Sequence, residues 1–345
     1  MTVLRAIRYS AVGAFFSGIV MVLQGCSVER EGALFAFLLF LLTFCSGPVS
    51  QPQSVETLFA FAVGNNGVIL HTRDGGITWS IQSTPTTEDL TGISCLTPTT
   101  CFTSGDNGLI LNTVDSGITW TLQATPTTDD LNDISCVSVN TCVAVSAQGD
   151  ILRTDNGGGL WITQTSPVIG SQAAVDCVNI NVCFAPIFIN DFIHTNDGNT
   201  WVSQTTPGFF TAESISCPSV LVCFAGILLD GNMFYTNDGG TWIIQATPLT
   251  AVGNILDVDC LSNTICFAIG STAGVDVIIQ TTNGSTWSQT LLTTSFRYFG
   301  LSCVDATSCI GVGFGGSTVH TRNGTTWTPQ SSPTSENLNA VAAIN

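Results

Sequence analysis

One short phrase recurs seven times in this 345-residue chain, at intervals of about 41 residues. Each copy begins with threonine, has aspartate or asparagine two residues later, continues through glycine and ends on tryptophan. The copies contain all seven tryptophans of the protein and read TRDGGITW (72–79), TVDSGITW (113–120), TDNGGGLW (154–161), TNDGNTW (195–201), TNDGGTW (236–242), TTNGSTW (281–287) and TRNGTTW (321–327). A period near 40, made of short apolar segments, is typical of a β-propeller with one repeat per blade. The sequence therefore predicts an all-β fold, a seven-bladed β-propeller with four antiparallel strands per blade, over residues 58–345.

The two ends of this repeat region complement each other. Residues 58–83 supply the three outer strands of a blade, whereas residues 338–345 supply an innermost strand with nothing after it. We therefore expect the C-terminal strand to complete the first blade and to close the ring. In that composite blade, the two positions that hold cysteines elsewhere are Ala60 and Ala343.

Twelve of the fourteen cysteines form pairs with one spacing, between the first two strands of a repeat. The six pairs are Cys95/Cys101, Cys136/Cys142, Cys177/Cys183, Cys217/Cys223, Cys260/Cys266 and Cys303/Cys309. Directly opposed residues of an antiparallel hairpin lie close enough for a disulfide. A structural zinc site would need four converging ligands, but these pairs fall in separate blades. The spacing predicts six disulfides, no metal site and an oxidising compartment.

The charge of the chain is strongly one-sided. It has no lysine, seven arginines and 24 acidic residues, for a formal net charge of −17. Such a charge repels phosphate groups, so we expect no nucleic-acid binding, and membrane contact only through the N-terminal segment. The acidity either attracts a cation or a basic partner, or serves the solubility of an exported protein.

Residues 1–45 have the composition of an export signal, or of a lipoprotein signal with a membrane tether. The apolar run Ala11–Leu23 is followed by Cys26, a possible lipidation site. Alternatively, translation starts at Met21 and a second apolar run, Ala33–Phe44, is the signal core. Neither run reaches the roughly 20 residues of a spanning helix.

Residues 46–57 are polar and read as a linker. We therefore expect an exported protein, which is periplasmic, anchored to the membrane as a lipoprotein, or secreted.

The repeated phrase explains several polar residues without catalysis. Its acidic position is aspartate in four copies and asparagine in three, so it needs a hydrogen-bond acceptor rather than a charge. His71, His194 and His320 each precede the threonine of a phrase and fill one repeat position, so no catalytic residue is predicted. The last four phrases are one residue shorter than the first three. Glutamine follows the tryptophan by three residues in six repeats, as Gln82, Gln123, Gln164, Gln204, Gln245 and Gln330.

The phrase resembles the Asp-box of BNR repeats, and the chain resembles the photosystem II assembly-factor-like family of exported bacterial proteins over residues 58–345. The shared pattern is clearest in residues 64–79, GNNGVILHTRDGGITW. The resemblance implies a non-enzymatic, exported, seven-bladed protein without a cofactor, which helps to assemble or bind other proteins. The paired cysteines and the scarcity of basic residues depart from the photosynthetic members, which puts photosystem binding itself in doubt.

Asp-box enzymes supply the alternative functions. Sialidases resemble this chain in the box, but they need three clustered arginines, and here only Arg297 falls outside the boxes and their flanks in the repeat region. Other Asp-box glycoside hydrolases need only two carboxylates on one face. For that class the candidates are Asp89, Asp129, Asp130 and Asp257.

The variable loops, on the rim opposite the boxes, hold the candidate binding residues. These residues are the aromatic side chains and the arginine at which the loops depart from the repeat: Phe209, Phe210, Phe296, Arg297, Tyr298 and Phe299. Exposed aromatics and arginine dominate protein interfaces. The expected partner is another envelope or extracellular protein, or a glycan, bound by a monomer.

Overall fold

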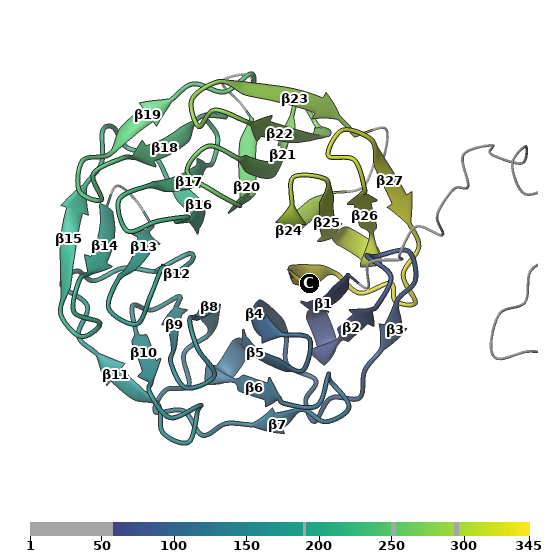
Figure 1. The fold of residues 1–345 in the computed structure, drawn as a ribbon. Coiled ribbons are helices and arrows are strands. Elements are labelled where there is room, and N and C mark those ends of the chain that lie inside the picture. The colour runs from purple at the N-terminus through teal and green to yellow at the C-terminus, as the bar shows by residue number, and fades with distance from the viewer. Residues whose placement is uncertain (1–57, 189–190, 250–252, 293–296) are drawn as a thin grey trace, which may run out of the picture. The chain divides into compact units, whose positions relative to one another are not determined.

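The structure is a computed structural model that describes residues 58–188, 191–249, 253–292 and 297–345. The predicted export signal, the lipidation site at Cys26 and the linker lie outside the described residues. Seven four-stranded antiparallel sheets form a ring around a central channel (Figure 1). The predicted seven-bladed propeller is therefore confirmed. No helix within the described residues has the length and apolar character needed to cross a membrane.

Each blade has strands a to d, counted from the channel outward. Blade 1 contains β28 (Leu338–Ile344), β1 (Phe59–Gly64), β2 (Ile69–Thr72) and β3 (Ser80–Ile81). Blade 2 contains β4 (Leu90–Thr97), β5 (Thr100–Gly105), β6 (Ile110–Thr113) and β7 (Thr121–Leu122), and blade 3 contains β8 (Leu131–Cys136), β9 (Cys142–Ser146), β10 (Ile151–Thr154) and β11 (Ile162–Gln164). Blade 4 contains β12 (Asp176–Cys177), β13 (Cys183–Ile187), β14 (Asp191–Thr195) and β15 (Trp201–Thr205).

The remaining blades follow the same order. Blade 5 contains β16 (Ala212–Ser216), β17 (Cys223–Ile227), β18 (Met233–Thr236) and β19 (Ile243–Gln245). Blade 6 contains β20 (Asn254–Cys260), β21 (Cys266–Thr272), β22 (Val275–Thr281) and β23 (Trp287–Leu291), and blade 7 contains β24 (Tyr298–Asp305), β25 (Ser308–Gly313), β26 (Thr318–Thr321) and β27 (Trp327–Gln330). Short 3₁₀ turns at Asn65–Gly67, Asp106–Gly108 and Phe314–Gly316 join strands b and c of three blades.

The chain ends close the ring as expected. Strand β28 pairs with β1 and places Ala343 opposite Ala60, at the positions that hold cysteines in the other blades. Those other blades contain six disulfides, each within one blade, with Cα–Cα distances of 4.0–4.1 Å. The predicted pairing is confirmed, and it implies an oxidising compartment.

The cystines are structural bridges and do not form an exposed site. The second cysteine of every pair, on strand b, is buried in the core with an exposed fraction of 0–1%: Cys101, Cys142, Cys183, Cys223, Cys266 and Cys309. Their partners on strand a, nearer the channel, are partly or fully buried: Cys95, Cys136, Cys177, Cys217, Cys260 and Cys303. Of the residues singled out in the sequence, these twelve therefore join the inner two strands of their blades as structural bridges.

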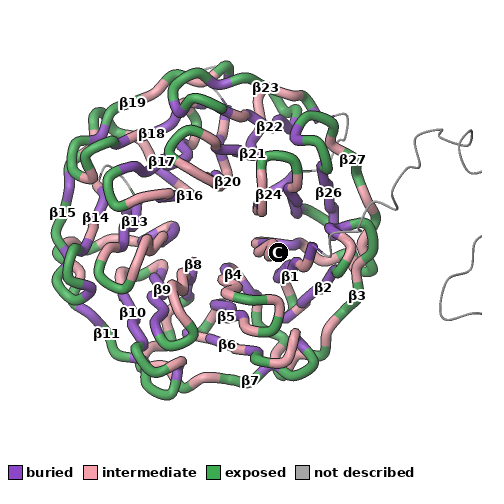
Figure 2. Tube along the Cα trace, viewed as in Figure 1, coloured by how far each residue is buried: buried purple, intermediate pink, exposed green. Residues whose placement is uncertain are grey.

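The hydrophobic core lies between neighbouring blades. Phe61 and Ile69 of blade 1, for example, pack against Leu90 and Trp120 of blade 2. Figure 2 shows buried residues concentrated on the inner strands and exposed ones on the outer strands and the turns. Because each blade buries its faces against two others, stability depends on the contacts between blades as well as on the sheets themselves.

The two rims of the ring differ in the loops they carry. In blade 3 the N–H of Gly157, in the Asp-box, donates to the carbonyl of Asn140, in the a–b hairpin, and the equivalent bond recurs in blades 2 and 4 to 7. The boxes and the cystine hairpins therefore share one rim, which we call the box face. The b–c and d–a connections share the opposite rim, the loop face.

Box length sets the geometry of the turn. Each of the first three boxes, the long boxes, has two consecutive residues with positive φ, such as Gly75 (67°) and Gly76 (83°). Each of the last four, the short boxes, has one, such as Gly198 (75°). Glycine adopts this left-handed region at little cost, which explains its recurrence in the phrase.

One side-chain oxygen shapes every box. Oδ1 of Asp197 accepts the N–H of Thr200 at 2.6 Å, and Oδ1 of Asn283 accepts that of Thr286 at 2.8 Å. Asparagine carries the same oxygen as aspartate, so both residues serve. The interpretation of this position as an acceptor is therefore correct.

Box length also decides a buried contact between blades, which we call the Gln–Trp clamp. In the clamp, the indole N–H of one blade donates to a glutamine Oε1 of the preceding blade, and the glutamine Nε2 donates to the carbonyl of the box glycine. For Trp242 and Gln204 the distances are 2.9 Å and, to Gly239, 2.7 Å. Equivalent clamps join Trp201 to Gln164 and Trp287 to Gln245.

The clamp is absent from the other four interfaces. The buried indole N–H groups of Trp79, Trp120, Trp161 and Trp327 have no partner among the described residues. The first three follow long boxes. Trp327 follows a short box, but the preceding blade has Thr290 in place of glutamine. A clamp thus needs both a short box and a glutamine.

Candidate binding site at the channel and the loop face

The innermost strand of each blade carries one extra residue, a β-bulge, near the loop face. In blade 2 the pairing register shifts between Leu90 and Gly92, which leaves Thr91 unpaired, and blade 4 has the same offset around Ala173. Such bulges redirect a side chain. All seven bulge residues line the loop-face part of the channel: Thr91, Asn132, Ala173, Glu213, Leu256, Phe299 and Asn339.

Three of these bulge residues link neighbouring blades. Asn132 Nδ2 donates to the carbonyl of Gln172 at 2.7 Å, and Asn339 Nδ2 to that of Leu90 at 2.8 Å. Thr91 Oγ1 makes the corresponding bond to the next blade. Their polar groups therefore have structural partners.

Glu213, Leu256 and Phe299, on blades 5 to 7, make no bond of this kind among the described residues. They border a cavity of about 290 Å³. Burial raises the pKa of the Glu213 carboxyl. This part of the channel therefore places the apolar side chains of Leu256 and Phe299 beside the carboxyl groups of Glu213 and Asp257.

Deeper in the channel, four aspartates join the blades. Asp176 Oδ2 accepts the N–H of Cys217 at 2.6 Å, and Asp259 Oδ2 accepts that of Cys303 at 2.6 Å. Ser94, Ser135, Ser216 and Ser302 accept the corresponding N–H through Oγ in the other such steps around the ring. Asp133 and Asp257 accept the N–H groups of Val175 and Leu301.

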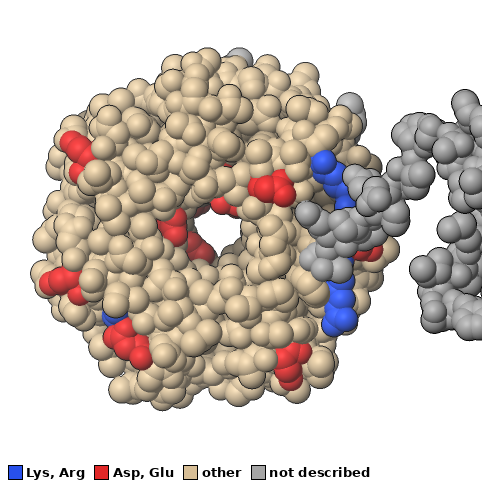
Figure 3. All heavy atoms as spheres, in the orientation of Figure 1, with Lys and Arg blue, Asp and Glu red and all other residues tan. Residues whose placement is uncertain are grey.

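Burial makes these four aspartates weaker acids, because it raises the pKa of each carboxyl group. Burial raises the pKa of Asp133 and Asp259 to about 6 and of Asp176 to about 7, and it raises the pKa of Asp257 well above its usual range. Acidic side chains are visible inside the central opening in Figure 3. No group of three or more His, Cys, Asp or Glu side chains within the described residues could hold a metal ion. Each of these carboxylates has a structural role in closing the ring.

The structure separates the six predicted binding residues. Phe209 is 88% exposed on the loop face, Phe210 is half-buried against Phe234, and Arg297 is exposed. Phe299 points into the channel as a bulge residue. Phe296 lies outside the described residues.

Tyr298 is the exception to a surface role. It is 1% exposed and packs in the core between blades 6 and 7 with Leu301 and Ile269, so it offers no contact surface. It stands five residues before the first cystine residue of its blade, a position that is buried in every blade: Leu90, Leu131, Gln172, Ala212, Ile255, Tyr298 and Leu338. The repeat register alone could have placed it inside.

Sequence reasoning missed further apolar side chains on the loop face. Ile169, Phe188 and Leu229 are exposed on connections of blades 3 to 5, and together with Phe209 and Phe210 they form what we call the loop-face patch. Leu229 is 76% exposed and has a φ of 61°, the left-handed region that a bulky residue rarely adopts. Nothing in the repeat marks these loop positions, so only the structure reveals them.

Three of the four carboxylates considered for a hydrolase, those of Asp89, Asp130 and Asp257, have structural partners. Asp89 Oδ1 accepts the N–H of Asn66 at 2.8 Å, and Asp130 Oδ1 accepts that of Asn107 at 2.9 Å. Asp257 joins blades in the channel. Asp129 lies on the connection that enters blade 3, and its own N–H donates to Thr127 Oγ1.

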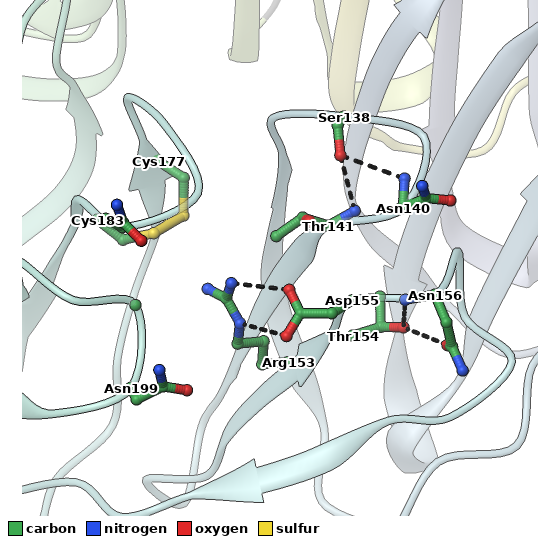
Figure 4. A network of polar contacts seen from close by, with 12 residues as sticks. Ser138, Asn140, Thr141, Arg153, Thr154, Asp155, Asn156, Cys177, Cys183 and Asn199 are labelled. Carbon is green, nitrogen blue, oxygen red and sulfur yellow. Dashed lines mark hydrogen bonds and ion pairs between the residues drawn. A yellow bond between two sulfur atoms is a disulfide. The ribbon is translucent and has the colours of Figure 1, made fainter.

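The arginines are dispersed. Arg153 is buried on strand β10 and forms a bidentate pair with Asp155 at 2.7 and 3.0 Å (Figure 4). Arg322 donates to the carbonyl of Asp74 on the box face. Arg297 lies on the loop face, so these arginines do not converge on one anion site.

Comparison with known proteins agrees with this geometry. Residues 53–181, which include the three long boxes, match the family model described as photosynthesis system II assembly factor YCF48. The chain resembles the YCF48 propellers. No protein with a curated description matches its sequence.

Three solved structures illustrate the likeness. A structure of YCF48 bound to a D1 peptide is 14% identical, with a TM-score of 0.62 over 80% of this chain and 89% of that one. YCF48 from Cyanidioschyzon merolae is 17% identical, with a TM-score of 0.58 over 73% and 88%. The Niastella koreensis GH74 enzyme is 11% identical, with a TM-score of 0.50 over 80% of this chain and 56% of that one. At these identities the likeness shows the fold alone.

Proposed function

We propose that this protein is a non-enzymatic, exported scaffold that binds another envelope or extracellular protein through its loop face. The loop-face patch is the contact, with Arg297 and the channel mouth at Phe299 beside it. The protein acts as a monomer, without a cofactor. The resemblance to YCF48, a propeller with a solved complex with a peptide, supports this reading over a hydrolase.

The observation that carries the proposal is Leu229. A bulky residue in the left-handed region costs free energy, on the order of 1–3 kcal/mol, and such strain clusters at functional sites. Here the turn presents an apolar side chain to solvent rather than burying it. Exposed apolar side chains that gather on one rim are typical of an interface.

The charge around the patch indicates the kind of partner. Eleven carboxylates lie in or beside the loop-face connections, against one arginine, Arg297. They are Glu88, Asp89, Asp106, Asp129, Asp130, Asp150, Asp191, Glu213, Asp230, Asp276 and Glu336. An acidic surface around apolar tips favours a partner segment with apolar and basic residues.

Site-specific photo-crosslinking in the intact cell envelope tests the proposal. A benzophenone amino acid placed at Phe209 should give a discrete protein adduct, and the same amino acid at Ile243, on the outer strand of the same blade, should not. Phe209→Ser combined with Leu229→Ser should abolish capture at a third loop-face position, Ile169, with little change in melting temperature, since surface substitutions usually cost under about 0.5 kcal/mol. Equal adducts at positions 209 and 243 would refute the loop-face assignment.

The hydrolase alternative has its own signature. Turnover of a β-glucan by the purified protein, lost on Asp129→Asn and kept on Asp150→Asn, would favour an enzyme. Absence of turnover together with a crosslinked adduct at Phe209 is the outcome expected of a scaffold.

A further inference from the structure

The long boxes place an apolar side chain at the tip of each of the first three blades. Ile77, Ile118 and Leu160 are 43%, 72% and 62% exposed there. Ile77 and Ile118 stand two residues before the tryptophan, where the four short boxes have the small or polar residues Asn199, Gly240, Ser285 and Thr325. In blade 3 that position is Gly159, and Leu160 stands one residue before the tryptophan, where the other boxes have threonine. The extra box residue and the apolar tip therefore occur together.

Two more exposed side chains extend this surface. Val114 lies in the box of blade 2, and Val139 lies in the a–b hairpin of blade 3, next to the box of that blade. We call Ile77, Val114, Ile118, Val139 and Leu160 the box-face strip. Blades 1 to 3 are neighbours in the ring (Figure 1), and the a–b hairpins of blades 4 and 5 continue the apolar surface on the same rim with Ile180, Val220 and Leu221, which are 52%, 40% and 52% exposed.

The three blades whose boxes carry the strip also have a buried indole N–H without a hydrogen-bond partner in the part of the chain that the structure describes. Trp79, Trp120 and Trp161, which follow the long boxes, lack the Gln–Trp clamp. A buried donor without a partner costs about 1–3 kcal/mol. Three consecutive blades share a long box, a missing clamp and an apolar tip. This recurrence indicates a functional surface rather than unrelated changes in single turns.

The chain meets the propeller beside this strip. The carbonyl of Leu58, the first described residue, accepts the N–H of Gly75 in the first long box, two residues from Ile77. The apolar run Ala33–Phe44 precedes it by 13 residues, 45–57, which can extend to about 45 Å. That run is too short to span a bilayer and has a length suited to lying at the interface with water.

The two rims also differ in charge, and the box face is the less acidic one. The box face carries six carboxylates and three arginines, two of which, Arg73 and Arg322, are exposed on the boxes next to where the chain enters blade 1. The loop face carries eleven carboxylates and one arginine. The box face is therefore the less acidic of the two rims.

We propose that the box-face strip rests on a phospholipid bilayer. Its apolar tips enter the headgroup region, and the acidic loop face points away from the membrane. This assignment goes beyond a tether alone, because it gives the propeller a fixed orientation. It does not depend on the partner proposed for the loop face.

Hydroxyl-radical footprinting of the full chain on phosphatidylcholine vesicles tests the orientation. Oxidation of Ile118 and Leu160 should fall several-fold when vesicles are added, whereas oxidation of Ile243 and Leu291, which are 52% and 56% exposed on outer strands, should not change. Protection without vesicles would mean that the N-terminal segment itself covers the strip, which would overturn the proposal. Equal oxidation with and without vesicles, or no vesicle binding at all, would overturn it too.

A pair of variants gives a second readout. Ile118→Ser with Leu160→Ser should weaken vesicle binding of the full chain about tenfold, because interfacial binding scales with buried apolar area. Ile243→Ser with Leu291→Ser is the matched control and should bind as the unaltered chain does. Equal binding by the two double variants would refute the strip. Failure of crosslinking at Phe209 would leave this result untouched.

Discussion

Two sectors of the ring differ in the hydrogen bonding of their buried tryptophan side chains. Blades 4 to 6 each receive a Gln–Trp clamp from the preceding blade, and their short boxes end in small or polar tips. Blades 1 to 3 have long boxes, apolar tips and indole N–H groups without a partner among the described residues. One extra residue in a surface turn thus changes both what the turn shows to solvent and which bond forms beneath it.

Blade 7 shows that a short box alone does not produce a clamp, because a glutamine in the preceding blade is also needed. Its box is short, yet Trp327 has no clamp, because Thr290 stands where the preceding blade needs glutamine. Gln82, Gln123 and Gln330 face the opposite situation, since the blades that follow them have long boxes. Gln123 Nε2 turns to Asn112 Oδ1 at 2.7 Å instead.

Removing a clamp should have the largest effect. Gln204→Ala leaves the Trp242 N–H and the Gly239 carbonyl unpaired, so we expect a loss of about 2–3 kcal/mol in the free energy of unfolding. Urea denaturation measures it. Gln82→Ala, in the sector without clamps, is the matched control and should cost under about 0.5 kcal/mol. Similar losses in both variants would remove the distinction between the sectors.

Adding a clamp should stabilise the seventh blade. Thr290→Gln places an amide next to the unpaired Trp327 N–H, and one new buried hydrogen bond is worth about 1 kcal/mol. Thr290→Asn carries the same amide on a side chain one methylene shorter and should give little gain. The comparison fails if the two variants have the same urea midpoint.

Shortening a long box should allow a clamp to form at an interface that lacks one. Deleting Gly76 leaves TRDGITW, which has the length of a short box and keeps Gly75 at the left-handed position. Trp79 should then donate to Gln330, with a gain of up to about 1 kcal/mol and a downfield shift of its indole proton. Deleting Gly284, the single left-handed residue of a short box, should instead destabilise the protein. An unchanged Trp79 resonance after the Gly76 deletion would contradict the role of box length.

Lowering the pH should reveal a smaller difference in stability, between boxes with aspartate and boxes with asparagine. Hydrogen bonds from Thr200 and Asn199 hold the pKa of Asp197 well below its usual range, so its contribution to stability is present above about pH 4 and is lost as the pH falls below that value. Asp197→Asn should flatten this acid-induced loss and leave neutral stability nearly unchanged, as the asparagine boxes indicate. A chemical-denaturation series from about pH 2 to 7 checks it. A large loss at neutral pH would show that the charge itself is needed.

The sequence predicted the parts of this molecule that repeat. The blade count, the closure at Ala60 and Ala343 and the six disulfides follow from positions that recur at a fixed interval, because each recurrence occupies the same place in a sheet. The same register could have placed Tyr298 in the core, but its aromatic character led to the prediction of a contact, which its burial does not support. Residues outside the repeat, such as Leu229, follow from the conformation of individual loops, which no periodicity encodes.

The Gln–Trp clamp shows an intermediate case. The glutamine at a fixed distance from tryptophan and the two box lengths are both visible in the sequence. Their connection is not, because the partners lie on different blades, 37 to 42 residues apart. A contact between repeats needs the ring geometry before it can be inferred.

A pair of double-mutant cycles tests the central claim, that box length and glutamine together decide which blade interfaces are clamped. The first cycle combines Gln204→Ala with Trp242→Phe, and the second combines Gln82→Ala with Trp120→Phe. Each cycle cancels the separate cost of losing either side chain and leaves their interaction energy. We expect a coupling of about 1–2 kcal/mol for the first pair and none for the second. Equal coupling energies in the two cycles would contradict the account.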